Sequence, residues 1–218
     1  MEILSIFWSI TRLLLLFCYF VLFVNPSMVS TLQLSNRRHP HLSNASDEEA
    51  LLGFLSGITY DPDQNLSTTW TPNVSFCNWT GVTCSRRRQR VVSLNISNMG
   101  LQGIISPLLG NLSFLRNLNL SYNNFHGHIP YQLGNLFRIK RFSLHMNLFQ
   151  DSIPATLVGC RSLLLLSMAS NNIKGNIPKE PCILPKLQFI GLGRNNLTGT
   201  IPACLGNCSG LEIRMQQQ

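Results

Sequence analysis

The chain repeats itself every 24 residues between about residues 89 and 212. Isoleucines recur in one column of this repeat, prolines follow in the next, and asparagines fill an earlier column. The members are Ile105, Ile129, Ile153, Ile177 and Ile201; Pro130, Pro154, Pro178 and Pro202; and Asn123, Asn147, Asn171 and Asn195. A unit of this length cannot bury its own apolar edge, so the repeat predicts a solenoid of five coils that pack on one another.

The stretch LNLSYNNFHGHIP, residues 118–130, indicates how one coil is built. Its leucines and Asn123 fit the template L-x-x-L-x-L-x-x-N of leucine-rich repeats. We expect Leu118 and Leu120 to point into the core from a short strand. Asn123 would bond backbone groups of neighbouring coils, because an amide offers both donor and acceptor. Gly127 allows the turn, and Pro130 begins the return path. The predicted fold is a curved leucine-rich-repeat solenoid, with short parallel β-strands on the concave face and an irregular or 3-10 convex side.

The N-terminus predicts passage through the secretory pathway. Arg12 precedes an apolar run of 12 residues, Leu13 to Val24, and Pro26 follows. A membrane span needs about 20 apolar residues, whereas the apolar region of a signal peptide needs about 7 to 15. We therefore interpret residues 1–30 as a signal peptide, cleaved somewhere between residues 25 and 32, with an uncleaved anchor as the alternative. The expected location is the cell exterior or the plasma membrane.

Glycosylation sequons agree with secretion. The pattern Asn-x-Ser/Thr predicts glycosylation sites at Asn44, Asn65, Asn73, Asn78, Asn95, Asn111, Asn119, Asn196 and Asn207.

Residues 43–88 precede the repeats and predict a cap. Ser46 and Glu49 have the spacing of a capping box, which predicts a helix from about Asp47 to Ser56. Cys77 and Cys84 follow, and in a secreted chain they are expected to form a disulfide that fixes the cap over the first coil. Zinc is disfavoured, because no further ligands have suitable spacing.

The chain is basic, with a formal net charge of +8 and a pI near 9.5. Such a balance raises the question of nucleic-acid binding. The densest basic run, SRRRQR at residues 85–90, lacks interleaved aromatic residues on which bases could stack. We therefore interpret it as a solvated basic surface and expect no nucleic-acid partner.

These motifs together resemble a known family. The pattern C-x-W-x-G-V-x-C from Cys77 to Cys84, the preceding SDEEALL helix, and the x-G-x-I-P units are similar to the extracellular part of plant leucine-rich-repeat receptor kinases. The likeness covers about residues 43 to 213, and the subfamily containing receptors of bacterial elicitors fits it best. It implies binding of a peptide or protein ligand, with a co-receptor ectodomain as a further partner. Full-length relatives are Ser/Thr kinases, but this chain carries no kinase region.

The repeat register predicts which residues face outward on the concave side. None of them is Asp or Glu, which disfavours hydrolysis by a pair of carboxylates. Asn95 and Asn119 would carry glycans over the first two coils, so we expect ligand contacts on coils three to five. The predicted contact residues are Arg141, His145, Met146, Phe189 and Arg194; the alternative is that these are ordinary exposed residues.

No catalytic residue, cofactor or metal is predicted. There is no nucleophile-elbow motif and no acid near His145. His126 and His128 flank the turn glycine, where a solvated turn is a simpler interpretation than a metal pair. Cys160 and Cys208 stand in a column of leucines and are expected to be core thiols. Pairing of Cys182 with Cys204 is left open.

The repeat pattern weakens near the C-terminus. Pro181 replaces a leucine in the fourth unit, and the core column of Leu118, Phe142, Leu166 and Ile190 falls on Arg214 at a strict period. Residues 213–218 are therefore predicted to be a non-repeat tail. This break favours part of a receptor ectodomain, truncated before its membrane span and kinase. The alternative is a stand-alone secreted repeat protein that acts as a decoy, a co-receptor-like binder or an enzyme inhibitor.

Overall fold

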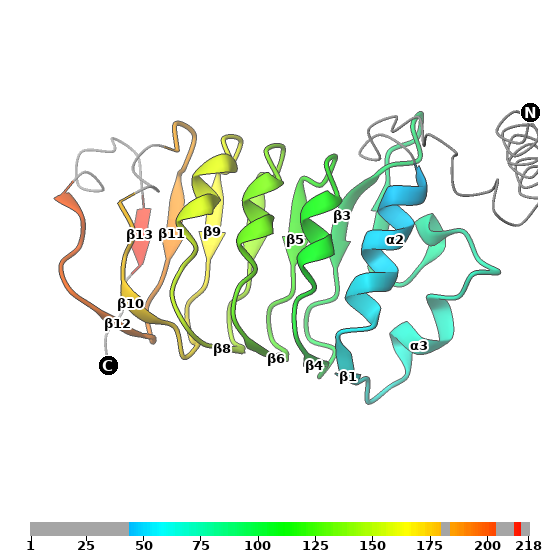
Figure 1. Ribbon diagram of the computed structural model, residues 1–218, viewed down its shortest axis with the longest axis horizontal. Coiled ribbons are helices and arrows are strands. Elements are labelled where there is room, and N and C mark those ends of the chain that lie inside the picture. Colours follow the sequence, from blue (N-terminus) through cyan, green and yellow to red (C-terminus); the bar gives the residue numbers. More distant parts are fainter. Residues whose placement is uncertain (1–43, 180–183, 204–211, 215–218) are drawn as a thin grey trace, which may run out of the picture. The chain divides into compact units, whose positions relative to one another are not determined.

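Short strands from successive coils form a seven-stranded sheet (Figure 1). The order is β13-β11-β9-β7-β5-β3-β2, and every pair is parallel except β2 with β3. Equivalent residues of neighbouring coils lie side by side, so that Leu118 pairs with Leu94 and with Phe142. The strands are β2 Val82–Cys84, β3 Val91–Asn95, β5 Asn117–Asn119, β7 Arg141–Ser143, β9 Leu165–Ser167, β11 Phe189–Gly191 and β13 Glu212–Arg214. The predicted leucine-rich-repeat fold is confirmed.

The computed structural model describes residues 44–179, 184–203 and 212–214. Several predicted features lie outside these ranges, namely the signal peptide, Pro181, Cys182, Cys204, Asn207 and Cys208. No helix within them is long and apolar enough to cross a membrane.

Each coil continues through a second short strand, and the first three coils also close through a 3-10 helix. The second strands are β4 Gln102–Gly103, β6 Asn124–Gly127, β8 Leu148–Phe149, β10 Lys174–Asn176 and β12 Asn196–Thr198; β1 Ile58–Tyr60 of the cap pairs antiparallel with β4. The 3-10 helices are η4 Pro107–Asn111, η5 Tyr131–Asn135 and η6 Ala155–Gly159. Figure 1 shows them as a row of short helices on the side opposite the seven-stranded sheet. We number the coils by their sheet strands, from coil one with β3 to coil five with β11.

Asparagine amides connect each coil to the one before it. The Oδ1 atom of Asn123 accepts hydrogen bonds from the backbone N–H groups of Met99 and Leu101, both at 3.1 Å. Its Nδ2 donates to the carbonyls of Ile96 and Leu120. Asn147, Asn171 and Asn195 make the equivalent contacts in coils three to five. The amide therefore satisfies backbone groups that the turn would otherwise bury without partners.

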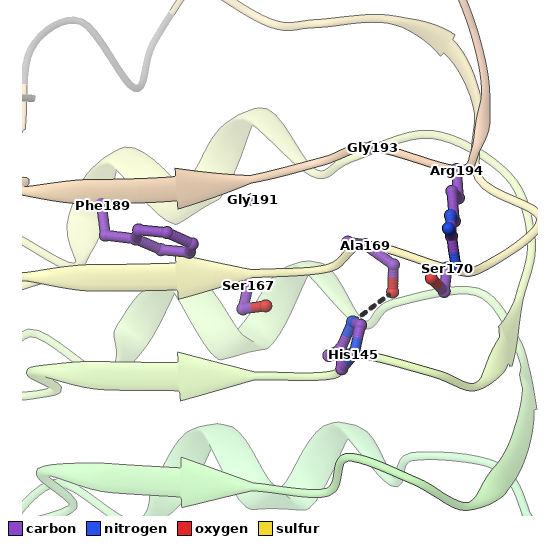
Figure 2. A pocket seen from close by; sticks show the side chains of 8 residues that line it. All are labelled: His145, Ser167, Ala169, Ser170, Phe189, Gly191, Gly193 and Arg194. Carbon is purple, nitrogen blue, oxygen red and sulfur yellow. Dashed lines mark hydrogen bonds between the residues drawn. The ribbon is translucent and has the colours of Figure 1, made fainter. Parts of the chain in front are cut away.

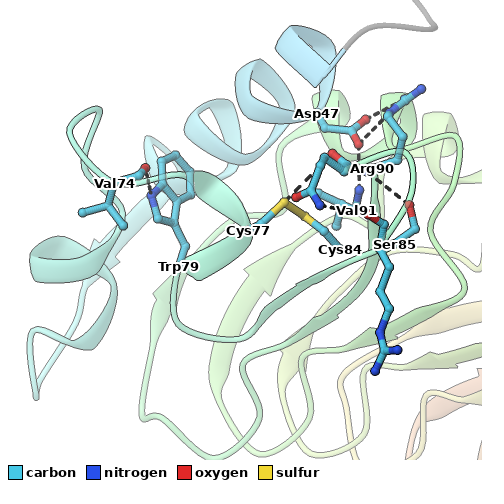
Figure 3. The surroundings of a disulfide bond; sticks show 10 residues. Asp47, Val74, Cys77, Trp79, Cys84, Ser85, Arg90 and Val91 are labelled. Atoms are coloured by element: carbon cyan, nitrogen blue, oxygen red, sulfur yellow. Dashed lines mark hydrogen bonds and ion pairs between the residues drawn. A yellow bond between two sulfur atoms is a disulfide. The ribbon is translucent and has the colours of Figure 1, made fainter.

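The cap covers the first coil with the helix α2, Asn44–Leu55, the short helix α3, Asn65–Thr69, and the 3-10 helix η3, Phe76–Asn78. Leu51 and Phe54 of α2 are fully buried. The capping-box prediction was wrong, because α2 begins before Ser46 and places that serine inside the helix. The disulfide between Cys77 and Cys84 is present and ties η3 to β2 (Figure 3).

A buried ion pair joins α2 to the start of β3. Arg90 donates to both carboxylate oxygens of Asp47, at 2.9 and 2.7 Å, and the Val91 N–H donates to the same carboxylate at 2.8 Å. Both charged side chains are almost completely buried. Figure 3 shows this cluster beside the disulfide. The sequence analysis did not predict this pair, since the partners stand 43 residues apart.

The predicted break at Arg214 is also wrong. β13 pairs Ile213 with Ile190 and Arg214 with Gly191, so Ile213 takes the place in register that a strict period assigns to Arg214. The step between these positions is 23 residues instead of 24, and a fixed-period alignment therefore slips by one. The sheet continues to Arg214, and the break no longer favours one of the two predicted functions over the other.

Candidate functional site

The concave face is the outer face of the seven-stranded sheet, which points away from the buried core. Within β5, Leu118 is fully buried while its neighbours Asn117 and Asn119 are half-buried. This alternation follows from the pleat of a strand. It recurs in β7 and β9, so the outward positions of these three strands are those that the repeat register predicts.

A hollow of about 330 Å³ lies on this face over coils three to five (Figure 2). Its lining residues are His145, Ser167, Ala169, Ser170, Phe189, Gly191, Gly193 and Arg194. The structure thus brings together three of the five predicted contact residues. Met146 lines a separate hollow of about 440 Å³ with Tyr122 and Leu148, and Arg141 is exposed at the start of β7 and lines neither hollow.

The hollow exists because outward side chains become smaller from coil three to coil five. One outward column reads Asn95, Asn119, Ser143, Ser167 and Gly191, and another reads Ser97, Ser121, His145, Ala169 and Gly193. A Cβ atom on Gly191 would come within 3.0 Å of the Phe189 ring and 3.5 Å of the Ser167 hydroxyl. Both glycines stand at predicted outward positions, but neither was among the predicted contact residues. The decreasing size from coil three to coil five in each column was the signal that could have found them.

His145 has a fixed orientation at the edge of the hollow. Its Nδ1 lies 3.1 Å from the carbonyl oxygen of Ala169, which can only accept, so Nδ1 carries the proton (Figure 2). The ring also meets Tyr122 edge to face, with centroids 5.2 Å apart. In the neutral ring Nε2 is then a hydrogen-bond acceptor.

The lining combines one imidazole, one aromatic ring and one guanidinium, with small polar groups between them. Among the described residues, none that lines it carries a carboxylate. Glu212 lies in β13, where it pairs with Phe189. The structure therefore places an acid on this sheet beyond coil five, at a position where none was predicted. In the described part of the chain no group of three or more His, Cys, Asp or Glu side chains could hold a metal ion. His126 and His128 are both exposed beside Gly127.

The sequons differ in exposure. Asn73, Asn78, Asn95 and Asn196 are exposed, and Asn65, Asn111 and Asn119 are half-buried. Asn95 and Asn119 lie at the ends of β3 and β5 and face outward. The oxygen of Asn95 accepts from Ser97, and that of Asn119 accepts from the Ser121 N–H. The hydrogen bonds that these amide oxygens accept therefore orient both side chains.

Two family models match the chain. The leucine-rich-repeat N-terminal domain matches residues 44–85, and the leucine-rich repeat matches residues 114–136 and 186–208. Among curated proteins, the LRR receptor-like serine/threonine-protein kinase EFR of Arabidopsis thaliana is 50% identical over 76 residues. This match covers 35% of the chain but 7% of EFR, so the chain spans a small part of the curated relatives that it matches.

Solved structures match over a larger share. The BIR2 ectodomain from Arabidopsis thaliana is 32% identical, with a TM-score of 0.65, over 73% of this chain and 85% of that one. The Arabidopsis receptor kinase HAESA ectodomain, solved with a peptide hormone ligand, is 28% identical with a TM-score of 0.60. That match covers 79% of this chain and 33% of HAESA.

Proposed function

Because the chain belongs to the leucine-rich-repeat family of plant receptor-kinase ectodomains, we propose that it is an extracellular recognition module that binds a peptide or protein ligand on coils three to five. A co-receptor ectodomain is a further proposed partner. The resemblance of the sequence motifs to receptors of bacterial elicitors supports a role in defence, and the similarity to the HAESA ectodomain, solved with a peptide hormone, supports peptide perception. The apolar run at Leu13–Val24 supports delivery through the secretory pathway.

The hollow at His145, Phe189 and Arg194 is the observation that carries this proposal. Binding sites are concave and place a few polar groups among apolar ones. Phe189 supplies an apolar surface, Arg194 a charged donor, and Nε2 of His145 an acceptor. A hydrolase of the carboxylate type would need a pair of acids that face one cleft. The described residues that line this hollow include no such pair.

Glycans on Asn95 and Asn119 would direct the ligand toward this hollow. They would stand on coils one and two, at least one coil away from His145. Glycopeptide mass spectrometry of the secreted chain should find both asparagines modified. Finding both unmodified would remove this part of the proposal.

The experiment that tests the proposal fills the hollow. A phage-displayed random dodecapeptide library is selected on the secreted, glycosylated chain, and the selected peptides are measured against Gly191→Leu. Leucine at this position occupies space between Phe189 and Ser167, so we expect at least a tenfold loss of affinity.

Ser143→Leu is the matched control, because it adds the same side chain in the same column two coils away and outside the hollow. It should change affinity less than twofold. Circular dichroism would verify that both variants are folded. Selected peptides that bind both variants as well as the parent chain would contradict the proposal.

A further inference from the structure

A third hollow, of about 450 Å³, lies beside the N-terminal ends of β3 and β5 and is rich in arginine. Asn95 and Asn119, two of the predicted glycosylation sites, stand at the opposite, C-terminal ends of these strands. Arg86, Arg87, Arg88, Arg116 and Arg138 line it together with Phe114. We call it the arginine pocket. Its arginines and Phe114 come from three segments, namely the turn between β2 and β3, the residues before β5, and the residues before β7.

The turn holds three of these arginines in place. The Ser85 N–H donates to the Arg90 carbonyl at 2.8 Å, and the Gln89 N–H donates back to the Ser85 carbonyl at 3.0 Å. Gln89 adopts a left-handed conformation with φ 48° to close the turn. The run that looked in sequence like a solvated basic stretch is therefore a closed turn with three exposed arginines at one side of a hollow.

Phe114 orients the guanidinium groups around the pocket. Arg138 and Arg90 lie 4.2 and 4.5 Å from its ring centroid, and Arg88 lies at 5.7 Å. Arg90 is neutralised by Asp47. Among the residues that the structure describes, no carboxylate is paired with any of the five arginines of the pocket. Contacts with an aromatic ring order a guanidinium without cancelling its charge.

Such an arrangement suits an anion. Guanidinium groups bind carboxylates through paired N–H···O bonds, and arginines that are already ordered lose less side-chain entropy on binding. An anionic group would also relieve the repulsion between like charges that share one hollow.

The charge does not continue along the stack. The column that begins with Val92 and Arg116 continues as Lys140, Leu164 and Gln188, and the adjacent column ends in Arg141, Leu165 and Phe189. In these two columns positive charge thus stops after coil three, where half-buried leucines and Phe189 follow. A uniform polyanion would lie partly on apolar surface, whereas a peptide can change from acidic to apolar along its length.

We propose that the arginine pocket binds the acidic segment of a peptide whose apolar segment reaches the hollow at Phe189. This inference rests on the proposed function, since it specifies the class of the ligand. β5 and β11, the strand that carries Phe189, are three strand spacings apart, about 14 Å. An extended peptide covers about 3.3 to 3.6 Å per residue, so about four residues join the two sites.

The test uses a fluorescein-labelled peptide of three glutamates, a Gly-Ser-Gly spacer and a phenylalanine-leucine pair. Its binding to the full secreted chain is measured by fluorescence anisotropy at physiological salt. The triple variant Arg86→Gln, Arg87→Gln, Arg116→Gln removes charge from the pocket and spares the arginines stacked on Phe114. The control variant Arg161→Gln, Lys174→Gln, Lys179→Gln removes the same charge from exposed positions elsewhere.

We expect the pocket variant to bind at least tenfold more weakly and the control variant to stay within twofold of the parent chain. A peptide with glutamines in place of the glutamates should bind the parent chain as weakly as the acidic peptide binds the pocket variant. Equal weakening of both variants would overturn the proposal, because binding would then follow net charge alone. Stronger binding of sodium polygalacturonate than of the peptide would overturn it in favour of an anionic polysaccharide.

The same peptide separates this inference from the proposed function. If Gly191→Leu weakens binding and the pocket variant does not, the proposed function stands and the arginine pocket is not part of the site. If the pocket variant weakens binding and Gly191→Leu does not, the pocket binds acidic peptides and the proposed hollow is wrong.

Discussion

Single side chains in the interior of the coils satisfy backbone groups or fill a fixed volume. The inward asparagine is the clearest case, because one amide bonds three backbone groups on two coils. Asn171 donates to the carbonyls of Leu144 and Met168 and accepts from the Phe149 N–H. Its neighbour Asn172 is exposed. Adjacent asparagines therefore have opposite tolerance of change.

Asn171→Asp should destabilise the fold by about 3 kcal/mol, because a carboxylate cannot donate to two buried carbonyls and brings a charge into the coil. Asn172→Asp, the identical change one residue later, should stay within about 0.5 kcal/mol. Guanidinium unfolding followed by circular dichroism measures both. Equal losses would show that the added charge, and not the missing donors, is responsible.

Cys160 is 1% exposed, and burial raises the pKa of its thiol from 9.0 to about 12. The thiol should therefore resist iodoacetamide at pH 8.5 in the folded chain and react on unfolding, as judged by the mass of the peptide that contains it. Because the folded pKa is the higher one, this group's contribution to stability is complete below pH 9 and is lost as the pH rises toward 12. Rapid alkylation of the folded chain would contradict the observed burial.

At the scale of elements, the cap depends on contacts between segments far apart in the sequence. The ion pair of Asp47 and Arg90 joins α2 to the start of β3. The Phe54 ring of α2 packs against the Phe125 ring of coil two, with ring centroids 5.8 Å apart. Removing one member of a buried ion pair leaves an unpaired charge, which costs more than removing both.

Asp47→Asn should lower the free energy of unfolding by about 3 to 5 kcal/mol. The double variant with Arg90→Met should be no less stable than Asp47→Asn alone, which gives a favourable coupling in a double-mutant cycle. Glu49→Gln, at an exposed position on the same helix, is the control and should change stability by less than about 0.5 kcal/mol. Additive effects of the two substitutions would mean that the pair is not coupled.

The helices and strands also show which structural features could be predicted from the sequence and which could not. Inward columns were predictable because Leu118, Asn123 and Ile129 have roles fixed by position within one coil. The ion pair of Asp47 was not, because no local pattern records a partner that the fold brings near. The hollow at Gly191 escaped prediction for another reason: it is made by the absence of side chains, whereas sequence analysis looks for residues that act.

At the scale of the whole molecule, each coil contacts its neighbours and little else. In such a stack, stability is the sum of local and nearest-neighbour contributions, and opening need not involve the whole chain. Damage to the cap should therefore stay near the cap.

Hydrogen–deuterium exchange read by mass spectrometry tests this expectation. Asp47→Asn should speed the exchange of amides in β3 and β5, while β9 and β11 keep the rates of the parent chain. A uniform increase from β3 to β11 would show instead that the described coils unfold as one cooperative unit.

The 23-residue step between Ile190 and Ile213 has a consequence for how such genes change. Register on the sheet survives although the spacing differs by one from the other coils, so what must be preserved is the alignment of inward positions and not the number of residues between them. Unequal recombination can then add or delete a whole coil, and single-codon insertions or deletions between sheet strands need not shift every later coil. Genes of this kind can therefore change the number of coils, and with it the length of the concave face, separately from the residues that each coil presents there.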